Sequence, residues 1–185
     1  RIGGIIMLAE RMNTFSGSPT SALIAKVAEL RAEGKDIISL NVGEPDFGTP
    51  DYIKCGAIKA IVDNFSKYTA GNGIIELRRL ISKKLHEDNN LEYTTDEICA
   101  TVGAKQAIFN SIMALVDPGD EVLLPVPCWV SYTEMIKFAG AKPVFVDVEA
   151  ETFDLDIEAL EKAVTTKTKA IVICTPNNPT GAVYS

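Results

Sequence analysis

The segment Thr101–Gln106 places one glycine between an apolar run and a run of helix-forming residues. A helix that begins there directs unpaired backbone N–H groups and the positive end of its dipole at whatever lies before it. Gly103 and Ala104 are small, so a phosphate group has room to approach. The same junction is compatible with a plain tight turn, and the segment alone leaves both interpretations open. A Rossmann dinucleotide site is disfavoured, because that pattern needs further glycines at fixed spacing.

Two more segments carry groups that suit a ligand. Trp129 is the only tryptophan and follows the apolar run Val122–Pro125. Its indole is suited to stack on a flat heteroaromatic ring, and it is equally compatible with a place in the core. The loop Thr175–Gly181 follows the apolar run Ala170–Cys174. Its prolines restrict the backbone, and Asn178 offers an amide N–H to a ligand oxygen.

Helical and strand periodicities alternate along the chain and predict the elements that position these segments. Helices are predicted from Pro19 to about Gly34, from about Gly73 to Leu85, and over 104–116, 129–138 and 157–164; Thr49 is predicted to cap a further helix with Pro50 at its first position. Strands are predicted at 37–42, 98–102, 121–125, 143–148 and 170–174. This alternation indicates an α/β fold, a mostly parallel sheet with helices on both faces, whose ligands bind at the carboxyl ends of strands.

Composition narrows the function classes. The 185 residues are 46% hydrophobic and 23% charged, which is typical of a globular chain with a core. The net charge of −7 and the lack of a basic cluster argue against a nucleic-acid partner, and no stretch predicts a membrane segment. The four cysteines form no CxxC pair and indicate reduced thiols in the cytoplasm. One histidine, His86, excludes a histidine-rich metal site and is expected to be a solvated side chain at a helix end.

The motifs together resemble a known family. Asn178–Gly181, with Gly103–Gln106, Trp129, Tyr68 and the loop at Gly43 in the same order, resembles the class I/II aminotransferases of fold type I, most of all the bacterial aspartate aminotransferase subgroup. The likeness covers nearly the whole chain from about residue 19. It implies pyridoxal phosphate as cofactor and an incomplete fold type I large domain. It also implies an arm at 1–18, a small-domain helix and strand at 19–48, and the first part of the cofactor-binding large domain at 49–185.

The resemblance assigns the cofactor contacts residue by residue. It implies that Gly103 and the backbone N–H groups of Ala104 and Lys105 hold the cofactor phosphate. It implies that Trp129 stacks on the pyridine ring and that Asn178 donates a hydrogen bond to the phenolic oxygen.

The substrate and partner contacts also follow from the resemblance. Gly43 faces the substrate carboxylate through its backbone, and Trp129 and Asn178 touch the substrate as well. Tyr68 matches a tyrosine whose hydroxyl reaches the phosphate bound to the partner subunit, so a homodimer is implied. One departure is Cys128, which stands where relatives usually carry an aromatic residue and is interpreted as a packing change.

No catalytic residue is assigned in this chain, because the family's Schiff-base lysine lies downstream of the Asn-Pro-Thr-Gly motif. Lys105 suits phosphate contact rather than that role. We expect an amino-terminal portion of an enzyme that transfers an amino group between an L-amino acid, aspartate by default, and a 2-oxo acid, with the 185-residue chain inactive by itself. The alternatives are another fold type I enzyme, such as a carbon–sulfur lyase or a synthase, and a non-catalytic module that binds pyridoxal phosphate.

Overall fold

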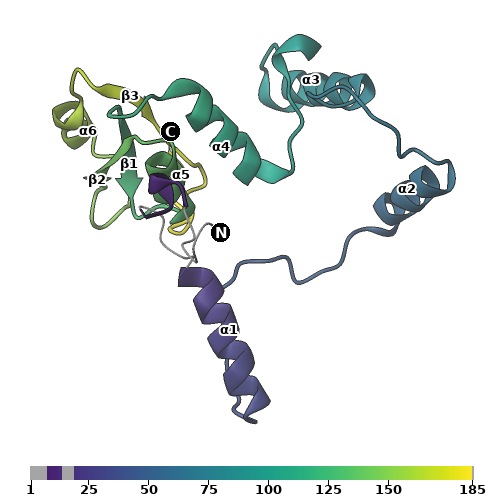
Figure 1. Cartoon of the computed structure of the whole chain (residues 1–185), viewed down its shortest axis with the longest axis horizontal. Coiled ribbons are helices and arrows are strands. Elements are labelled where there is room, and N and C mark those ends of the chain that lie inside the picture. Colours follow the sequence, from purple (N-terminus) through teal and green to yellow (C-terminus); the bar gives the residue numbers. More distant parts are fainter. Residues whose placement is uncertain (1–7, 14–18, 185) are drawn as a thin grey trace, which may run out of the picture. The chain divides into compact units, whose positions relative to one another are not determined.

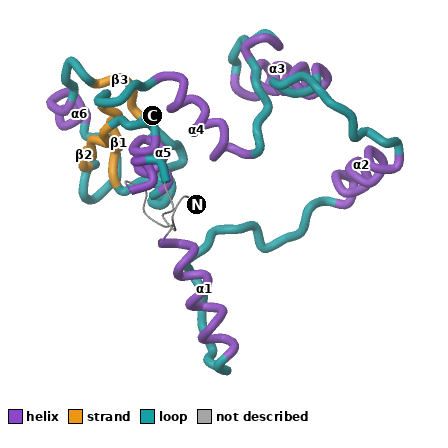
Figure 2. The backbone as a smooth tube through the Cα atoms, viewed as in Figure 1, coloured by secondary structure: helices purple, strands orange, loops and turns teal. Residues whose placement is uncertain are grey.

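The computed structural model describes residues 8–13 and 19–184, so the predicted arm at 1–18 lies largely outside the described residues. The chain divides into two compact units, one of Ala22–Ala107 and one of Ile108–Ser185 with the residues up to Ser21. The elements, drawn in Figures 1 and 2, are η1 Glu10–Asn13, α1 Pro19–Ala32, α2 Asp51–Val62, α3 Ile75–Asn89, η2 Thr95–Glu97, α4 Gly103–Leu115, β1 Glu121–Val126, α5 Ser131–Phe138, β2 Lys142–Asp147, α6 Ile157–Ala163 and β3 Thr168–Ile171. Within the described ranges, none of the helices has the length and apolar character that a membrane span requires.

The unit that contains residues 108–184 is built on a parallel sheet of three strands in the order β2-β1-β3. Glu121 at the start of β1 lies opposite Lys142 on one side and Thr168 on the other. The next residue, Val122, pairs with Ala170, so β3 carries one extra residue and is bulged there. The predicted α/β architecture with a mostly parallel sheet is confirmed.

The core of this unit follows from the alternation of side chains along β1. Val122 and Leu124 are fully buried in the cluster that contains Ile112 of α4 and Ile136 of α5. Leu123, between them, points to the other face and lines a hollow with residues of α6. Helices therefore cover both faces of β1, and each such buried side chain contributes about 1.5–3 kcal/mol to the free energy of unfolding.

A buried carboxylate links the beginnings of the strands. Glu121 accepts a hydrogen bond of 2.7 Å from the Thr165 hydroxyl, and its other oxygen lies 3.2 Å from Lys142 Nζ. The Thr165 hydroxyl, and then Lys142, lower the pKa of the Glu121 carboxyl. The carboxylate therefore stays charged and partnered, which is what burial of an ionised group requires.

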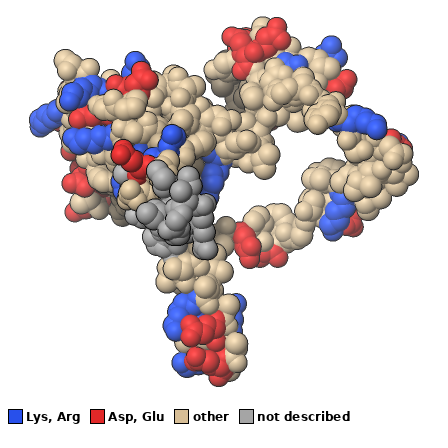
Figure 3. Space-filling model, in the orientation of Figure 1, with Lys and Arg blue, Asp and Glu red and all other residues tan. Residues whose placement is uncertain are grey.

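The unit that contains residues 22–107 has its tightest packing around α3. Gly73, just before this helix, has φ of +98°, and a Cβ there would lie 2.8 Å from Ala100 Cβ. Ala100 N donates to Asn72 O at 3.0 Å, so the entry to α3 and the segment after η2 lie against each other. On α1, acidic and basic side chains occur together (Figure 3), as in the Lys26–Glu29 pair at 2.8 Å.

Several predicted elements need correction. The segments 37–42 and 98–102 are not strands: an apolar run becomes a strand only where another strand pairs with it, and no described strand pairs with either segment. Helix α5 begins at Ser131 rather than Trp129, and β3 covers Thr168–Ile171 rather than 170–174. At α2 the N-cap is Pro50 and no side chain caps the helix, so the predicted Thr49 cap is also wrong. The domain boundaries at 19–48 and 49–185 stay a prediction.

Candidate functional site

Trp129 lies in a short turn after β1, which we call the tryptophan turn (Pro127–Trp129). Its ring is half-buried and meets the ring of Tyr132 edge-on, with centroids 5.3 Å apart and planes at 89°. Tyr132 N donates to Trp129 O at 3.2 Å, so the turn leads directly into the first turn of α5. Trp129 packs against the core cluster and also keeps part of its surface outside it. The core interpretation of this residue is therefore partly met, and stacking on a ligand stays a prediction.

The second segment, Thr175–Gly181, is called here the asparagine loop. Asn178 is exposed, and the peptide bonds before Pro176 and Pro179 are cis. Tyr184 N donates to Thr175 Oγ1 at 3.1 Å, which brings the chain after the loop back to its beginning. The two ends of the loop are therefore held together, and Asn178 between them is exposed.

The tryptophan turn and the asparagine loop are joined by one side chain. Asn177 Nδ2 donates to Pro127 O at 3.0 Å, although the two residues are 50 positions apart. The loop follows β3 and the turn follows β1, and these strands are adjacent and parallel. Trp129 and Asn178 are thus held at the carboxyl edge of the sheet, where open α/β sheets bind their ligands. Asn178 was predicted from the sequence and Asn177 was not, although Asn177 lies inside the same Thr175–Gly181 motif.

The start of α4 has the form of an anion site. Gly103 has φ of +75°, and apart from its chain neighbours and the backbone of its own helix, no atom of the described residues lies within 4 Å of the point where a Cβ would stand. Gln106 Oε1 accepts a hydrogen bond of 2.6 Å from Val102 N, and Thr101 Oγ1 donates to Gly103 O at 3.1 Å. The turn is therefore fixed by its own side chains and by the Gly103 N–H, which donates to Thr101 O at 2.9 Å. Ala104, the next residue of the helix, is exposed.

The remaining predicted residues lie in the unit of residues 22–107. Gly43 is in an exposed loop, and Tyr68 is fully exposed. Asn41, two residues before Gly43, has a buried Nδ2 atom without a hydrogen-bond partner among the described residues. His86, at the end of α3, is exposed, and its Nδ1 lies 2.7 Å from Glu92 Oε1, as expected of a solvated helix end.

The groups beneath Trp129 are held in their uncharged forms. Burial, followed by the neighbouring Cys174 and Cys128, raises the pKa of Tyr132 to about 12. Burial also raises the pKa of the Cys128 thiol. Neither group supplies an acid or a base near neutral pH, so they support the indole rather than take part in proton transfer.

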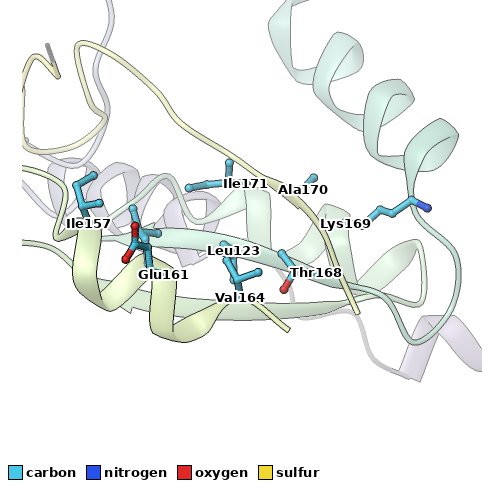
Figure 4. Close-up of a pocket in the computed structure, with 9 residues that line it drawn as sticks. Leu123, Ile157, Glu161, Val164, Thr168, Lys169, Ala170 and Ile171 are labelled. Carbon is cyan, nitrogen blue, oxygen red and sulfur yellow. The ribbon is translucent and has the colours of Figure 1, made fainter. Parts of the chain in front are cut away.

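A hollow of ≈ 410 Å³ lies between α6 and the β1–β3 pair (Figure 4). Its lining is mainly apolar: Leu123, Ile157, Leu160, Val164, Ala170 and Ile171. Glu161, Thr168 and Lys169 complete the lining, and none of the predicted site residues belongs to it. Over the described ranges, no cluster of His, Cys, Asp and Glu is placed to hold a metal ion. The candidate site residues therefore lie at the carboxyl edge of the sheet in one unit and at the start of α4 in the other.

Comparison with known proteins shows the family of this chain. The family model described as aminotransferase class I and II matches residues 35–185. A probable aspartate/prephenate aminotransferase of Rickettsia conorii is 48% identical over 180 residues, which are 97% of this chain and 45% of the relative. The aspartate aminotransferase of Bacillus subtilis is 44% identical over 96% of this chain and 46% of its own. The chain spans about half the length of the curated relatives it matches.

Solved structures give the same result. The aspartate aminotransferase of Thermus thermophilus with maleate aligns with a TM-score of 0.94 and 44% identity over 98% of this chain and 48% of that chain. An alanine aminotransferase of Pyrococcus furiosus aligns with a TM-score of 0.90 and 34% identity over 97% and 46%. The fold is therefore that of the large domain of fold type I, pyridoxal-phosphate-dependent enzymes. The chain belongs to the class I and II aminotransferase family.

Enzymes of this family depend on pyridoxal phosphate, and the residues present fit that group. A helix start at a positive-φ glycine, followed by the exposed Ala104, suits a phosphate ester. A half-buried indole suits the face of a pyridine ring, and an exposed amide suits its phenolic oxygen. When bound, the cofactor supplies the electron sink that stabilises negative charge at the α-carbon of an amino acid.

Proposed function

We propose that this protein is a pyridoxal-phosphate-dependent aminotransferase that moves the amino group of an L-amino acid to a 2-oxo acid. The observation that carries the proposal is the joining of the tryptophan turn to the asparagine loop at the carboxyl edge of adjacent parallel strands. This edge thereby carries both an aromatic ring and an amide donor in a chain of this family. The whole reaction is proposed for the complete protein, since the chain spans about half of its relatives' length.

The proposed cofactor contacts come from three segments. Backbone N–H groups at Ala104 and Lys105, after the positive-φ Gly103, bind the phosphate. Trp129 stacks on the pyridine ring, and its contact with Tyr132 and the core limits the directions in which the ring can turn. Asn178 donates to the phenolic oxygen and favours its ionised form.

The proposed substrate is a dicarboxylic amino acid with aspartate as the first candidate. Relatives named aspartate/prephenate aminotransferase at 47–48% identity support aspartate as donor and prephenate as one acceptor. Maleate, the ligand named for the Thermus thermophilus structure, is also a dicarboxylate. On this side of the reaction, Gly43 would receive the substrate carboxylate through its backbone, with Trp129 and Asn178 against the rest of the substrate.

We also propose a homodimer in the cytoplasm. Tyr68 is fully exposed, which leaves its hydroxyl able to reach the phosphate of a second subunit. The four free cysteines agree with a reducing compartment.

The test is an assay of the complete protein with pyridoxal phosphate, using aspartate as donor and 2-oxoglutarate or prephenate as acceptor. We expect amino transfer, and we expect Asn178→Ala to lower kcat/KM by about ten- to a hundredfold, the loss for one hydrogen bond to a charged group. Asn64→Ala is the matched control, because Asn64 is an exposed turn residue. Absence of transfer from every amino donor, or release of ammonia and a 2-oxo acid in place of transfer, would contradict the proposal.

A further inference from the structure

Asn177 is one of the few buried polar side chains, with 8% of its surface exposed, and both hydrogens of its amide nitrogen are used. Nδ2 donates to Pro127 O at 3.0 Å and to Thr180 Oγ1 at 2.9 Å. The first bond leaves the asparagine loop and reaches the tryptophan turn, and the second stays within the loop. One atom therefore links the two segments that carry Trp129 and Asn178.

The backbone of Asn177 closes the loop that its side chain ties down. Its N–H donates to Ala182 O at 2.8 Å, and its carbonyl accepts from Gly181 N at 2.8 Å. Thr180 Oγ1 accepts a second bond of 3.2 Å from Ala182 N. These bonds hold the loop together around Asn177. The bond from Asn177 Nδ2 to Pro127 O connects the loop to the tryptophan turn. Loss of that bond frees the loop as a whole rather than one side chain.

We propose that Asn177 is a positioning residue that sets the placement of the Asn178 amide relative to the Trp129 ring. The inference rests on the proposed function, in which these two groups hold the edge and the face of one pyridine ring. The tryptophan turn is the fixed partner, because it is continuous with the buried strand β1 and packs on Tyr132. An amide at position 177 is required, since a single atom must donate to two oxygens, and a carboxylate cannot donate at all.

Asn177→Asp tests the donor at nearly constant size. The variant places a carboxylate oxygen against the Pro127 carbonyl oxygen, and two acceptors at this distance repel each other. Asn64→Asp is the matched control with the same change of atoms and charge. Asn64 is exposed, and its Nδ2 lies 3.5 Å from Val62 O, so the exchange there breaks no buried hydrogen bond.

Fluorescence of the 185-residue chain reports on Trp129 alone, because the chain has no other tryptophan. Without cofactor, we expect Asn177→Asp to shift the emission to longer wavelength and to increase quenching by acrylamide, while Asn64→Asp leaves both unchanged. An emission unchanged in Asn177→Asp, or shifted equally in Asn64→Asp, overturns the inference.

Titration with pyridoxal phosphate separates this inference from the proposed function. We expect saturable quenching in the parent chain and an affinity about tenfold lower in Asn177→Asp, the factor that corresponds to ~1.4 kcal/mol. Absence of amino transfer by the complete protein overturns the proposed function, whereas the cofactor-free emission of the chain still decides the role of Asn177. An affinity equal in the parent and in Asn177→Asp overturns the inference.

A second pair of variants decides the question if Asn177→Asp loses the far-ultraviolet circular dichroism of the parent chain. Thr180→Val removes the hydroxyl that accepts from Asn177 Nδ2, and Thr180→Ser keeps it. We expect the valine variant to shift the Trp129 emission and the serine variant to match the parent. Equal emission in the two variants overturns the inference, because valine keeps the side-chain volume of threonine and loses only the hydroxyl.

Discussion

Tyr132 is the residue with the most strongly shifted titration beneath the candidate site. It is 6% exposed, and burial, together with Cys174 and Cys128, raises its pKa to about 12. In the unfolded chain a tyrosine ionises near pH 10. Between pH 10 and pH 12 the unfolded chain therefore loses the hydroxyl proton of Tyr132, whereas the folded chain keeps it. The stability that depends on a neutral Tyr132 is complete below pH 10 and is lost as the pH rises toward 12.

We expect the free energy of unfolding to fall between pH 10 and 12 by up to roughly 3 kcal/mol more in the parent chain than in Tyr132→Phe. Phenylalanine keeps the ring and removes the group that titrates. Urea unfolding at pH 9, 10 and 11.5, followed by circular dichroism, measures the difference. Tyr52→Phe, at an exposed position of α2, should behave like the parent. Equal losses in the parent and in Tyr132→Phe would contradict the shift.

Some residues of the candidate site could be predicted from local sequence motifs, and others could not. Asn178 and Trp129 were predicted from residue type and order, because both belong to segments whose local sequence is distinctive. Asn177 was not predicted, since its role depends on a carbonyl 50 residues away. The pKa shift of Tyr132 likewise depends on burial by other segments.

Among the elements, α3 and η2 are joined by a buried arginine. Arg78 is 8% exposed; its Nε donates to Gly73 O at 3.1 Å and its Nη1 to Thr95 O at 2.7 Å. The exposed Asp96 carboxylate lies 3.8 Å from Nη1. The guanidinium therefore fixes the entry of α3 and the start of η2 at the same time, with carbonyl acceptors that have no charge of their own.

Arg78→Leu should lower the free energy of unfolding of this unit by about 1–3 kcal/mol for each carbonyl left buried without a donor. Arg79→Leu is the control. Arg79 is the next residue of α3 and is exposed, and its replacement by leucine removes the same charge. Urea unfolding of both variants gives the comparison. A loss in Arg79→Leu as large as that in Arg78→Leu would mean that charge, rather than the two carbonyl bonds, explains the effect.

At the scale of the whole molecule, burial is unevenly distributed between the units. Val122, Leu124 and Ile136 are fully buried, whereas α2 has no buried residue and exposes Ile58 and Ile61 by 60% and 77%. Amide exchange follows the free energy of local opening, which is largest where apolar contacts are dense. The sheet and α5 should therefore be the most stable part of the described chain.

Hydrogen–deuterium exchange of the 185-residue chain, read by peptide mass, should give the slowest exchange in β1 and α5 and fast exchange in α2. Peptides from α1 serve as an internal reference, since that helix is also largely exposed. Protection of α2 equal to that of β1 would contradict the distribution of burial, because it would require a packing surface on α2.

The sequence by itself determined the family, the α/β class and most helices, because helix periodicity, turn residues and the ordered motifs are local properties of the chain. It also located Gly103 at the start of α4 and Asn178 in its loop. Only the tertiary structure decided that 37–42 and 98–102 are not strands and that Asn177 joins two loops. Strand pairing, burial and hydrogen bonds between distant segments depend on which residues meet in space, and a local pattern does not contain that information.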